Sequence, residues 1–200
     1  MNYTLDDNQN PLSFSYIESH FKFQKRDPIK KENKSAMESA VLCLIFKESD
    51  ELNVLLTKRS EFLKNHPGEI SFPGGRIEIE DRSPLEAALR ETREEIGIPT
   101  KDIKIFGQLD EIITGTGFHI IPFIGKLKTT ENLVLNKDEV TETLILPLSV
   151  LSDKSNHVRS KKIFNNKEYE FWKINYLHYN IWGATGSILV GLANELWHKQ

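Results

Sequence analysis

Two apolar runs, separated by a charged turn, stand out in the first third of the chain. Residues 40–46 read AVLCLIF and residues 53–59 read NVLLTKR, with KESDE at 47–51 between them. Continuous apolar runs of this length, bounded by polar turns, predict strands. Further strands are predicted at residues 70–72, 103–110, 119–127, 143–146, 163–164 and 168–174. Asn165-Asn166 between the last two is a hairpin signal.

The pattern changes to helical spacing at Pro84. Ser83 is a natural N-cap, Pro84 suits the first helical position, and Glu86 follows three residues after Ser83 as in a capping box. Gly97 offers a left-handed end. This predicts a helix over residues 84–96, with a core-facing stripe formed by Leu85, Leu89, Thr92 and Ile96.

Three other segments read as helices. Residues 185–198 carry apolar side chains at helical spacing, at Ile188, Leu189, Leu192, Ala193 and Leu196. Residues 147–152 predict a brief helix, and residues 15–23 a short one that docks on the domain or on the partner subunit of a homodimer. The order of elements predicts an α/β fold, with a mixed sheet sandwiched between helices. We expect residues 1–36 to form a polar N-terminal extension with a linker at 25–35, and residues 37–200 to form the domain.

Composition narrows the function class. The chain has 200 residues, 28% of them charged, and a net charge of −3, so we expect no bulk nucleic acid as a partner. Cys43 is the lone cysteine and lies inside an apolar run, which indicates a buried small hydrophobe. We expect no membrane segment and no secretory leader, and therefore a cytoplasmic protein with a small-molecule substrate.

Three acids lie together on the predicted helix. Glu91, Glu94 and Glu95 have the spacing i, i+3 and i+4, so they share a face beside the apolar stripe. Ala87 and Ala88 beside them would leave space above the helix. One interpretation is a solvated acidic face, to which Arg90 adds a partial counter-charge. The other is an oxygen-ligated site for a hard divalent cation such as Mg²⁺. The glycine turn Gly74-Gly75, which runs through an acidic loop into this helix, favours the second.

This stretch resembles the Nudix box of diphosphate hydrolases. The box is a glycine, a spaced acid and then R-E-U-x-E-E-x-G-U, where U is aliphatic. Residues 90–98 read RETREEIGI and match its second half, with Thr92 at an aliphatic position. In the first half, counted from Gly75, the acid position holds Asp81 in place of Glu, with one residue more than the general pattern has before Arg90. The coenzyme A diphosphatase branch typically has this Asp and this extra residue.

Other segments resemble the same branch. Residues 55–60 read LLTKRS and residues 66–75 read HPGEISFPGG, close to the signature that precedes the box there; Lys64 stands where arginine is usual. Residues 116–118, TGF, resemble its SGY/SGF loop. Residues 181–185, IWGAT, resemble its C-terminal IWGxTA, with Gly186 at the final alanine. The resemblance covers about residues 38–197 and implies the Nudix fold, an α/β/α sandwich.

The resemblance also implies roles for individual residues. It gives Mg²⁺ or Mn²⁺ as the cofactor, with Glu91 and Glu95 as direct ligands, Glu94 as a third ligand or supporting residue, and the Gly75 carbonyl as a further donor. Glu91, Glu94 and Arg90 are the implied catalytic residues, Arg90 by orienting a box glutamate. The general base is either a box glutamate or a later one, Glu139 or Glu142. The implied substrate-binding residues are Arg59, Ser60, Lys64, His66, Gly68 and Phe72.

The residues themselves leave alternatives open. Arg59 is a phosphate-binding candidate or an ordinary strand-end charge. His66 is a binding residue or a loop residue that orders Gly68. We expect His119 to be structural.

The leading hypothesis is hydrolysis of coenzyme A, or of its acyl or oxidised forms, to 4′-phosphopantetheine and adenosine 3′,5′-bisphosphate. The alternatives are a Nudix hydrolase of another nucleoside diphosphate derivative (ADP-ribose, a dinucleoside polyphosphate or capped RNA) and a non-catalytic Nudix-fold binding module.

Overall fold

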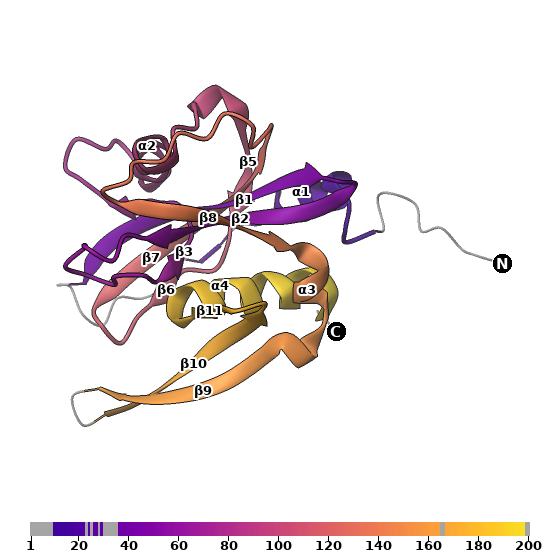
Figure 1. Ribbon diagram of the computed structural model, residues 1–200. Helices are drawn as coiled ribbons and strands as arrows, with labels where there is room; N and C mark the ends of the chain where they lie inside the picture. Colours follow the sequence, from indigo (N-terminus) through magenta and orange to yellow (C-terminus); the bar gives the residue numbers. More distant parts are fainter. Residues whose placement is uncertain are drawn as a thin grey trace.

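The computed structural model describes residues 10–22, 24, 26–27, 29, 36–164 and 167–198. The helices are α1 (Phe14–Lys22), α2 (Pro84–Ile96), α3 (Leu148–Ser152) and α4 (Gly183–Ala193), which continues into a π-helical turn at Asn194–His198. The strands are β1 (Met37–Glu48), β2 (Glu51–Arg59), β3 (Ile70–Ser71), β4 (Gly74–Arg76), β5 (Ile103–Gln108), β6 (Ile112–Ile113), β7 (Phe118–Leu127), β8 (Val140–Pro147), β9 (His157–Phe164), β10 (Lys167–Tyr176) and β11 (Tyr179–Trp182). Figure 1 labels them along the chain.

The strands form two sheets. The larger has the order β3-β2-β1-β7-β5, with β8 on β2, β4 on β1 and β6 on β7. Its β1–β7 pair is parallel and its other pairs are antiparallel, so the sheet is mixed, as predicted. The smaller is the antiparallel sheet β11-β10-β9.

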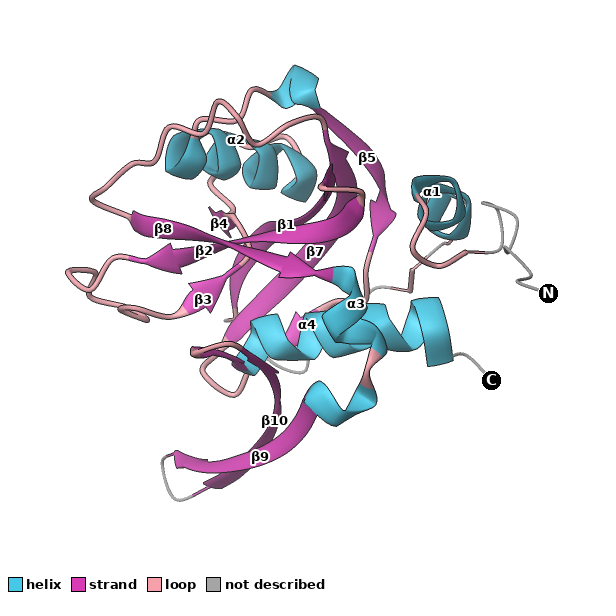
Figure 2. Cartoon of the chain, turned by 45° about the vertical axis from the view of Figure 1, so that its right-hand side comes forward, coloured by secondary structure: helices cyan, strands magenta, loops and turns pink. Residues whose placement is uncertain are grey.

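Helices cover both faces of the larger sheet. Ala40, Leu42 and Leu44 of β1 are buried in one cluster with Ala87 and Ile96 of α2. Cys43 and Ile45, the alternate residues of the same strand, are buried in another with Leu189 of α4. Successive side chains of a strand point to opposite faces, so a strand covered on both sides must be apolar throughout. Figure 2 shows α2 and α4 on either side of the sheet, which confirms the predicted α/β/α arrangement.

The N-terminal helix α1 docks on its own domain. Ile17 and Phe21 are fully buried in the cluster that contains α4. Arg26 continues this attachment, since its guanidinium donates to Asp110 at 2.8 Å and to Glu195 at 2.6 Å. Of the expected linker at 25–35, only Arg26, Asp27 and Ile29 are among the described residues, and the expected Asn165-Asn166 turn lies outside them.

The ends of α2 follow its sequence signals, with two corrections. Ser83 Oγ accepts a hydrogen bond from the Glu86 N–H at 3.2 Å, and Gly97 closes the helix at φ 74°. The Glu86 carboxylate accepts from the Arg82 N–H at 2.8 Å, so the reciprocal half of the capping box is absent between the described Ser83 and Glu86. Ala87 and Ala88 do not leave open space either, because both are fully buried under β1.

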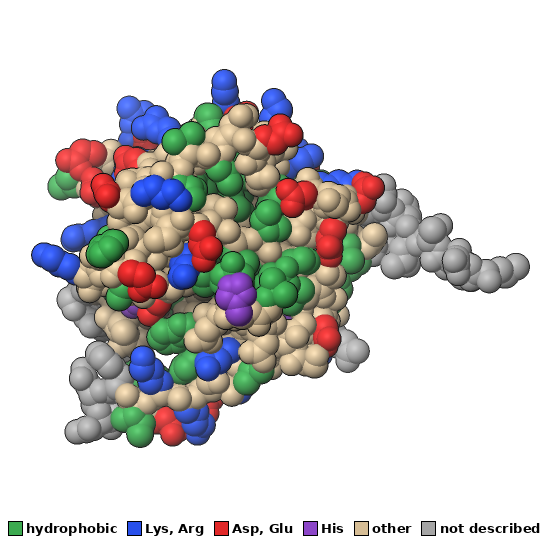
Figure 3. Space-filling view, viewed as in Figure 1, with side chains coloured by type: hydrophobic (Ala, Val, Ile, Leu, Met, Phe, Trp, Pro, Cys, Tyr) green, Lys and Arg blue, Asp and Glu red, His purple; other side chains and the backbone are tan. Residues whose placement is uncertain are grey.

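Several short elements carried too little pattern for prediction. Strands β4, β6 and β11 have two to four residues each, and β9 extends well before the predicted residues 163–164. Their pairing partners are distant in sequence, and that information is not contained in a local window. Among the described residues, no helix is long and apolar enough to cross a membrane. Figure 3 shows Lys/Arg and Asp/Glu side chains intermixed over one face.

Candidate active site

Glu95 lies at the junction of α2 with the glycine turn. Its side chain is 2% exposed. One carboxylate oxygen, Oε2, accepts a hydrogen bond from the Gly74 N–H at 3.0 Å, and the other, Oε1, lies 3.9 Å from Nη1 of Arg59. Burial raises the pKa of Glu95 to about 8, against the opposing effects of Gly74 and Arg59. The turn, the helix and the end of β2 therefore converge on one buried carboxylate.

Glu91 lies one turn earlier, over Gly75. A Cβ atom at Gly75 would lie 2.5 Å from the Glu91 carboxylate, so a side chain there would displace the acid. Burial raises the pKa of Glu91, and the nearby charges of Glu94 and Glu139 raise it further, while Arg90 lowers it. Glycine at this position therefore leaves the space that the Glu91 carboxylate occupies.

Arg90 holds the acids of the loop and the helix together. Its Nε and Nη2 donate to the two oxygens of Asp81 at 3.0 and 2.9 Å, and its Nη1 donates to Glu91 at 2.8 Å and to Glu94 at 3.1 Å. Nη2 also donates to the Arg76 carbonyl. The guanidinium lowers the pKa of Asp81. Arg90 therefore pairs with two box glutamates, as expected, and Asp81 anchors Arg90. Sequence reasoning did not predict this role for Asp81. The signal in the sequence was an acid in the loop, nine residues before Arg90, that could form an ion pair with it.

Of the two later glutamates, the structure brings one to the carboxylates. Glu139 belongs to the segment that lies along the end of α2, where the Asn136 N–H donates to the Glu95 carbonyl at 2.9 Å and the Asn136 side chain donates to Glu139 at 3.1 Å. The charge of Glu139 contributes to the raised pKa values of both Glu91 and Glu95. Glu142 instead lies on β8, 3.5 Å from Nζ of Lys58.

The segment upstream of the box divides into buried and exposed residues. Ser60 is fully buried in the turn after β2, where its N–H donates to the Glu139 carbonyl at 2.8 Å, and Phe72 is 2% exposed within the core. Lys64 is exposed. His66 Nδ1 lies 2.9 Å from Glu69, which raises the His66 pKa.

Arg59 and Gly68 also belong to this segment. Nε of Arg59 is buried, and no hydrogen-bond partner for it exists among the described residues. Gly68 has φ 68° and lies against the Glu61 carboxylate. Of the six expected substrate-binding residues, the structure thus brings Arg59 to the carboxylates and places Ser60 and Phe72 in the interior.

The donor set suits a hard divalent cation. Glu91 and Glu95 are two largely buried carboxylates, and burial raises the pKa of both. Oxygen donors of this kind are the ligands that Mg²⁺ and Mn²⁺ take. Among the described residues, no group of three or more His, Cys, Asp or Glu side chains stands ready at metal-ligand spacing. Glu94 is 48% exposed and paired with Arg90, so it would have to turn to join the other two.

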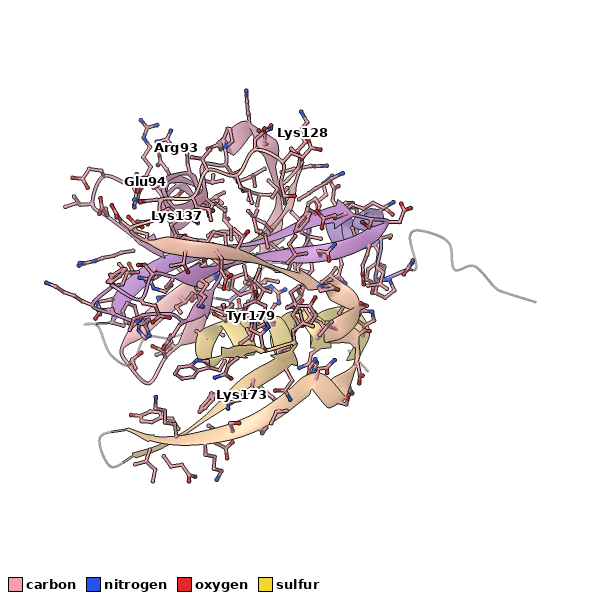
Figure 4. The ribbon with its side chains drawn as sticks, in the orientation of Figure 1. Arg93, Glu94, Lys128, Lys137, Lys173 and Tyr179 are labelled. Carbon is pink, nitrogen blue, oxygen red and sulfur yellow. The ribbon has the colours of Figure 1, made fainter. Side chains whose placement is uncertain are left out.

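The arrangement of the site in space follows the layers of the fold. Figure 4 labels Glu94 on the α2 side of the larger sheet, near Arg93 and Lys137. Tyr179 and Lys173 lie on the opposite side, by α4 and β10.

Comparisons with known proteins indicate the family of this chain. The NUDIX domain family matches residues 37–174. The uncharacterized Nudix hydrolase NudL of Photorhabdus laumondii is 33% identical over 189 residues, covering 92% of this chain and 98% of that protein. NudL of an Enterobacter species is 32% identical over 150 residues, covering 75% and 78%. Among solved structures, a MutT protein from Methanosarcina mazei is similar, with a TM-score of 0.47 and 25% identity over 60% of this chain and 83% of its own.

The family match spans more than half of the chain and includes the glycine turn, the acidic loop and α2. Members of this family generally depend on divalent metal ions. The chain belongs to the Nudix family and is a Nudix hydrolase, a pyrophosphohydrolase.

Proposed function

We propose that this protein hydrolyses the diphosphate bond of coenzyme A or its derivatives, giving 4′-phosphopantetheine and adenosine 3′,5′-bisphosphate. One observation carries the proposal: the segment that resembles the coenzyme A branch contacts the carboxylates of the box. Arg59 lies 3.9 Å from Glu95, and the Gly74 N–H at the end of the same segment donates to Glu95. A motif that only stabilised the fold would not need to present a guanidinium to the catalytic acids.

Charge supports a metal at this place. Mg²⁺ or Mn²⁺ held by Glu91 and Glu95, with Glu94 and the Gly75 carbonyl as further donors, would neutralise the diphosphate and lower the pKa of a water molecule. Arg90 supports this set through its bond to Glu91, which fixes the orientation of that carboxylate. Glu94 would have to leave Arg90 to become a donor. The bidentate pair of Arg90 with Asp81 holds the guanidinium itself in place.

Arg59 is the residue that we assign to the substrate. Its side chain is 27% exposed, and its ion pair with Glu95 is long at 3.9 Å. The buried Nε lacks a hydrogen-bond partner among the described residues. A guanidinium with unused donors beside the catalytic acids suits a phosphate oxygen, to which it can donate two parallel hydrogen bonds.

Hydrolysis needs a group that accepts the proton of the attacking water. The water oxygen bonds to one phosphorus while the bond from that phosphorus to the bridging oxygen breaks, and the bridging oxygen leaves with the other phosphate. We assign Glu139 as the group that accepts this proton, because its charge raises the pKa values of both Glu91 and Glu95. Glu142 is the weaker candidate since it pairs with Lys58.

The single buried thiol of Cys43 is compatible with a cytoplasmic setting.

A substrate panel tests the proposal. Wild-type protein with Mg²⁺ or Mn²⁺ is given CoA, acetyl-CoA, oxidised CoA, ADP-ribose, NADH and diadenosine polyphosphates, and the products are identified by mass spectrometry. We expect preferential release of 4′-phosphopantetheine and adenosine 3′,5′-bisphosphate. Faster cleavage of a nucleotide outside the CoA group would overturn the substrate assignment. Tight CoA binding with no cleavage of any compound would overturn the activity.

A further inference from the structure

A recess lies on the other side of the larger sheet from the carboxylates of α2. It has a volume of about 400 Å³, within the range of small-molecule sites. Lys58 and residues 67–70 form one wall, and residues 178–180 with Trp182 form the other. Where Figure 4 labels Tyr179, Figure 3 shows hydrophobic side chains gathered at the surface. The recess thus joins the segment upstream of the box to the β10–β11 hairpin.

The walls of the recess are held together by the IWGAT segment. Thr185 Oγ1 donates to the Ile70 carbonyl at 3.0 Å, which ties the start of α4 to β3. Gly186 allows α4 to lie directly on the Trp172 carbonyl of β10, where a Cβ would collide. These two contacts position β11 opposite residues 67–70. The IWGAT segment and the segment upstream of the box therefore form the recess together.

The side chains of the recess suit a flat ring with a phosphate. The His178 and Tyr179 rings lie 4.1 Å apart at 33°, and Trp182 lies 5.4 Å from Phe171. Aromatic faces of this kind stack with nucleic-acid bases. Lys58 is the one lysine or arginine in the described lining. The carboxylates near it have partners, since Glu69 pairs with His66 and Glu142 pairs with Lys58 at the moderate distance of 3.5 Å.

The recess is connected to the carboxylates through two consecutive residues. Lys58 lines the recess, and Nη1 of Arg59 lies 3.9 Å from Glu95. The register of β2 with β8 shifts between these two residues, so their side chains do not follow the regular alternation of a strand. The Arg59 N–H also donates to the carbonyl of Glu69, which lines the recess, at 3.0 Å. Both residues lie where β2 ends.

We infer that this recess binds the adenosine 3′-phosphate end of the substrate, with the base against Tyr179 and Trp182 and the phosphate at Lys58. The inference rests on the proposed function and adds to it the place of the nucleoside. The pantetheine arm fits less well, since it is a flexible chain without a ring that could stack on Tyr179.

Calorimetric titration of adenosine 3′,5′-bisphosphate and of 4′-phosphopantetheine tests the inference without turnover. The variants are Tyr179→Leu and Lys58→Met, and the matched control is Lys161→Met on β9, whose Nζ pairs with Glu168 outside the recess. We expect the affinity for adenosine 3′,5′-bisphosphate to fall about tenfold in each recess variant, in line with the loss of one stacking or phosphate contact. The control and the affinity for 4′-phosphopantetheine should not change.

The results of this titration distinguish binding at the recess from hydrolysis of CoA. Wild-type affinity for adenosine 3′,5′-bisphosphate in both recess variants, with circular dichroism unchanged, would overturn the inference even if CoA is cleaved. A loss of affinity for 4′-phosphopantetheine instead would overturn it in favour of the other arm. Loss confined to adenosine 3′,5′-bisphosphate would support the recess even if the panel shows that CoA is not hydrolysed. Lys58→Met keeps the test valid if Tyr179→Leu does not fold.

Discussion

The substitution Gly186→Ala should destabilise the protein, whereas Gly191→Ala in the same helix should stabilise it. Both replace hydrogen by methyl within α4, so the gain in helix propensity, about 1 kcal/mol, is common to both. Their surroundings differ. A Cβ at Gly186 would lie closer than 3.0 Å to the Trp172 carbonyl oxygen, which is backbone, while a Cβ at Gly191 would meet nothing within 4 Å.

The magnitude follows from this difference. Forcing a methyl group into a packed contact typically costs about 1 to 3 kcal/mol, and a backbone carbonyl within a sheet yields less than a flexible side chain. We therefore expect Gly186→Ala to lose up to about 2 kcal/mol net of the propensity gain, and Gly191→Ala to gain about 0.5 to 1 kcal/mol. Each kcal/mol corresponds to about 2 to 4 °C in Tm for a domain of this size.

Urea unfolding followed by fluorescence measures the free energy of unfolding of both variants beside the wild type. A Gly186→Ala protein as stable as Gly191→Ala would refute the reasoning, because it would mean that α4 does not lie against the Trp172 carbonyl. It would also remove one of the two contacts that form the recess. A loss of CoA affinity in Gly186→Ala, with Gly191→Ala unchanged, would be the expected companion result.

Three further predictions concern the site. Glu95→Gln should lower kcat by about a thousandfold, because a charged ligand is lost, and should leave the circular dichroism spectrum unchanged; a rate close to wild type would remove Glu95 from the metal site. Glu139→Gln should lower kcat by about a hundredfold or more while Glu142→Gln stays within about twofold, and the reverse order would exchange their assignments. His66→Gln should lose less than about 1 kcal/mol of stability, only at low pH. Glu69 raises the His66 pKa, so this stabilisation is fully present below the ordinary value of about 6.5 and is lost as the pH rises through the higher value in the folded protein. Equal unfolding midpoints of His66→Gln and wild type in acid buffer would contradict it.

Local signals in the sequence were sufficient for the elements that depend on local physics. Ser83, Pro84 and Gly97 determine where α2 begins and ends, and the continuous apolar run at residues 40–46 predicts the strand β1. The buried Thr92 shows how a polar residue fits an aliphatic position, since its hydroxyl donates to the Ala88 carbonyl at 2.7 Å. The glutamates of α2 were identified by their spacing together with the family resemblance.

The remainder depends on contacts between distant segments, which periodicity does not encode. Ser60 and Phe72 belong to a motif associated with substrate, yet both are buried, because the motif must also fold the turn that it forms. No role was predicted for Asp81, because its ion pair with Arg90 at 2.9 Å forms only when the loop folds back on α2. Tyr179 drew no attention in the sequence, since its position opposite Gly68 arises only when the β10–β11 hairpin packs beside β3.

The most direct test of the central claim is hydrolysis of CoA in ¹⁸O-labelled water with Mg²⁺, followed by mass spectrometry of both products. Our account predicts one ¹⁸O atom per turnover in the new phosphate oxygen of either 4′-phosphopantetheine or adenosine 3′,5′-bisphosphate, and no label in a Glu95→Gln reaction over the same time. CoA that stays intact, or that is cleaved at a bond other than the diphosphate, would contradict it.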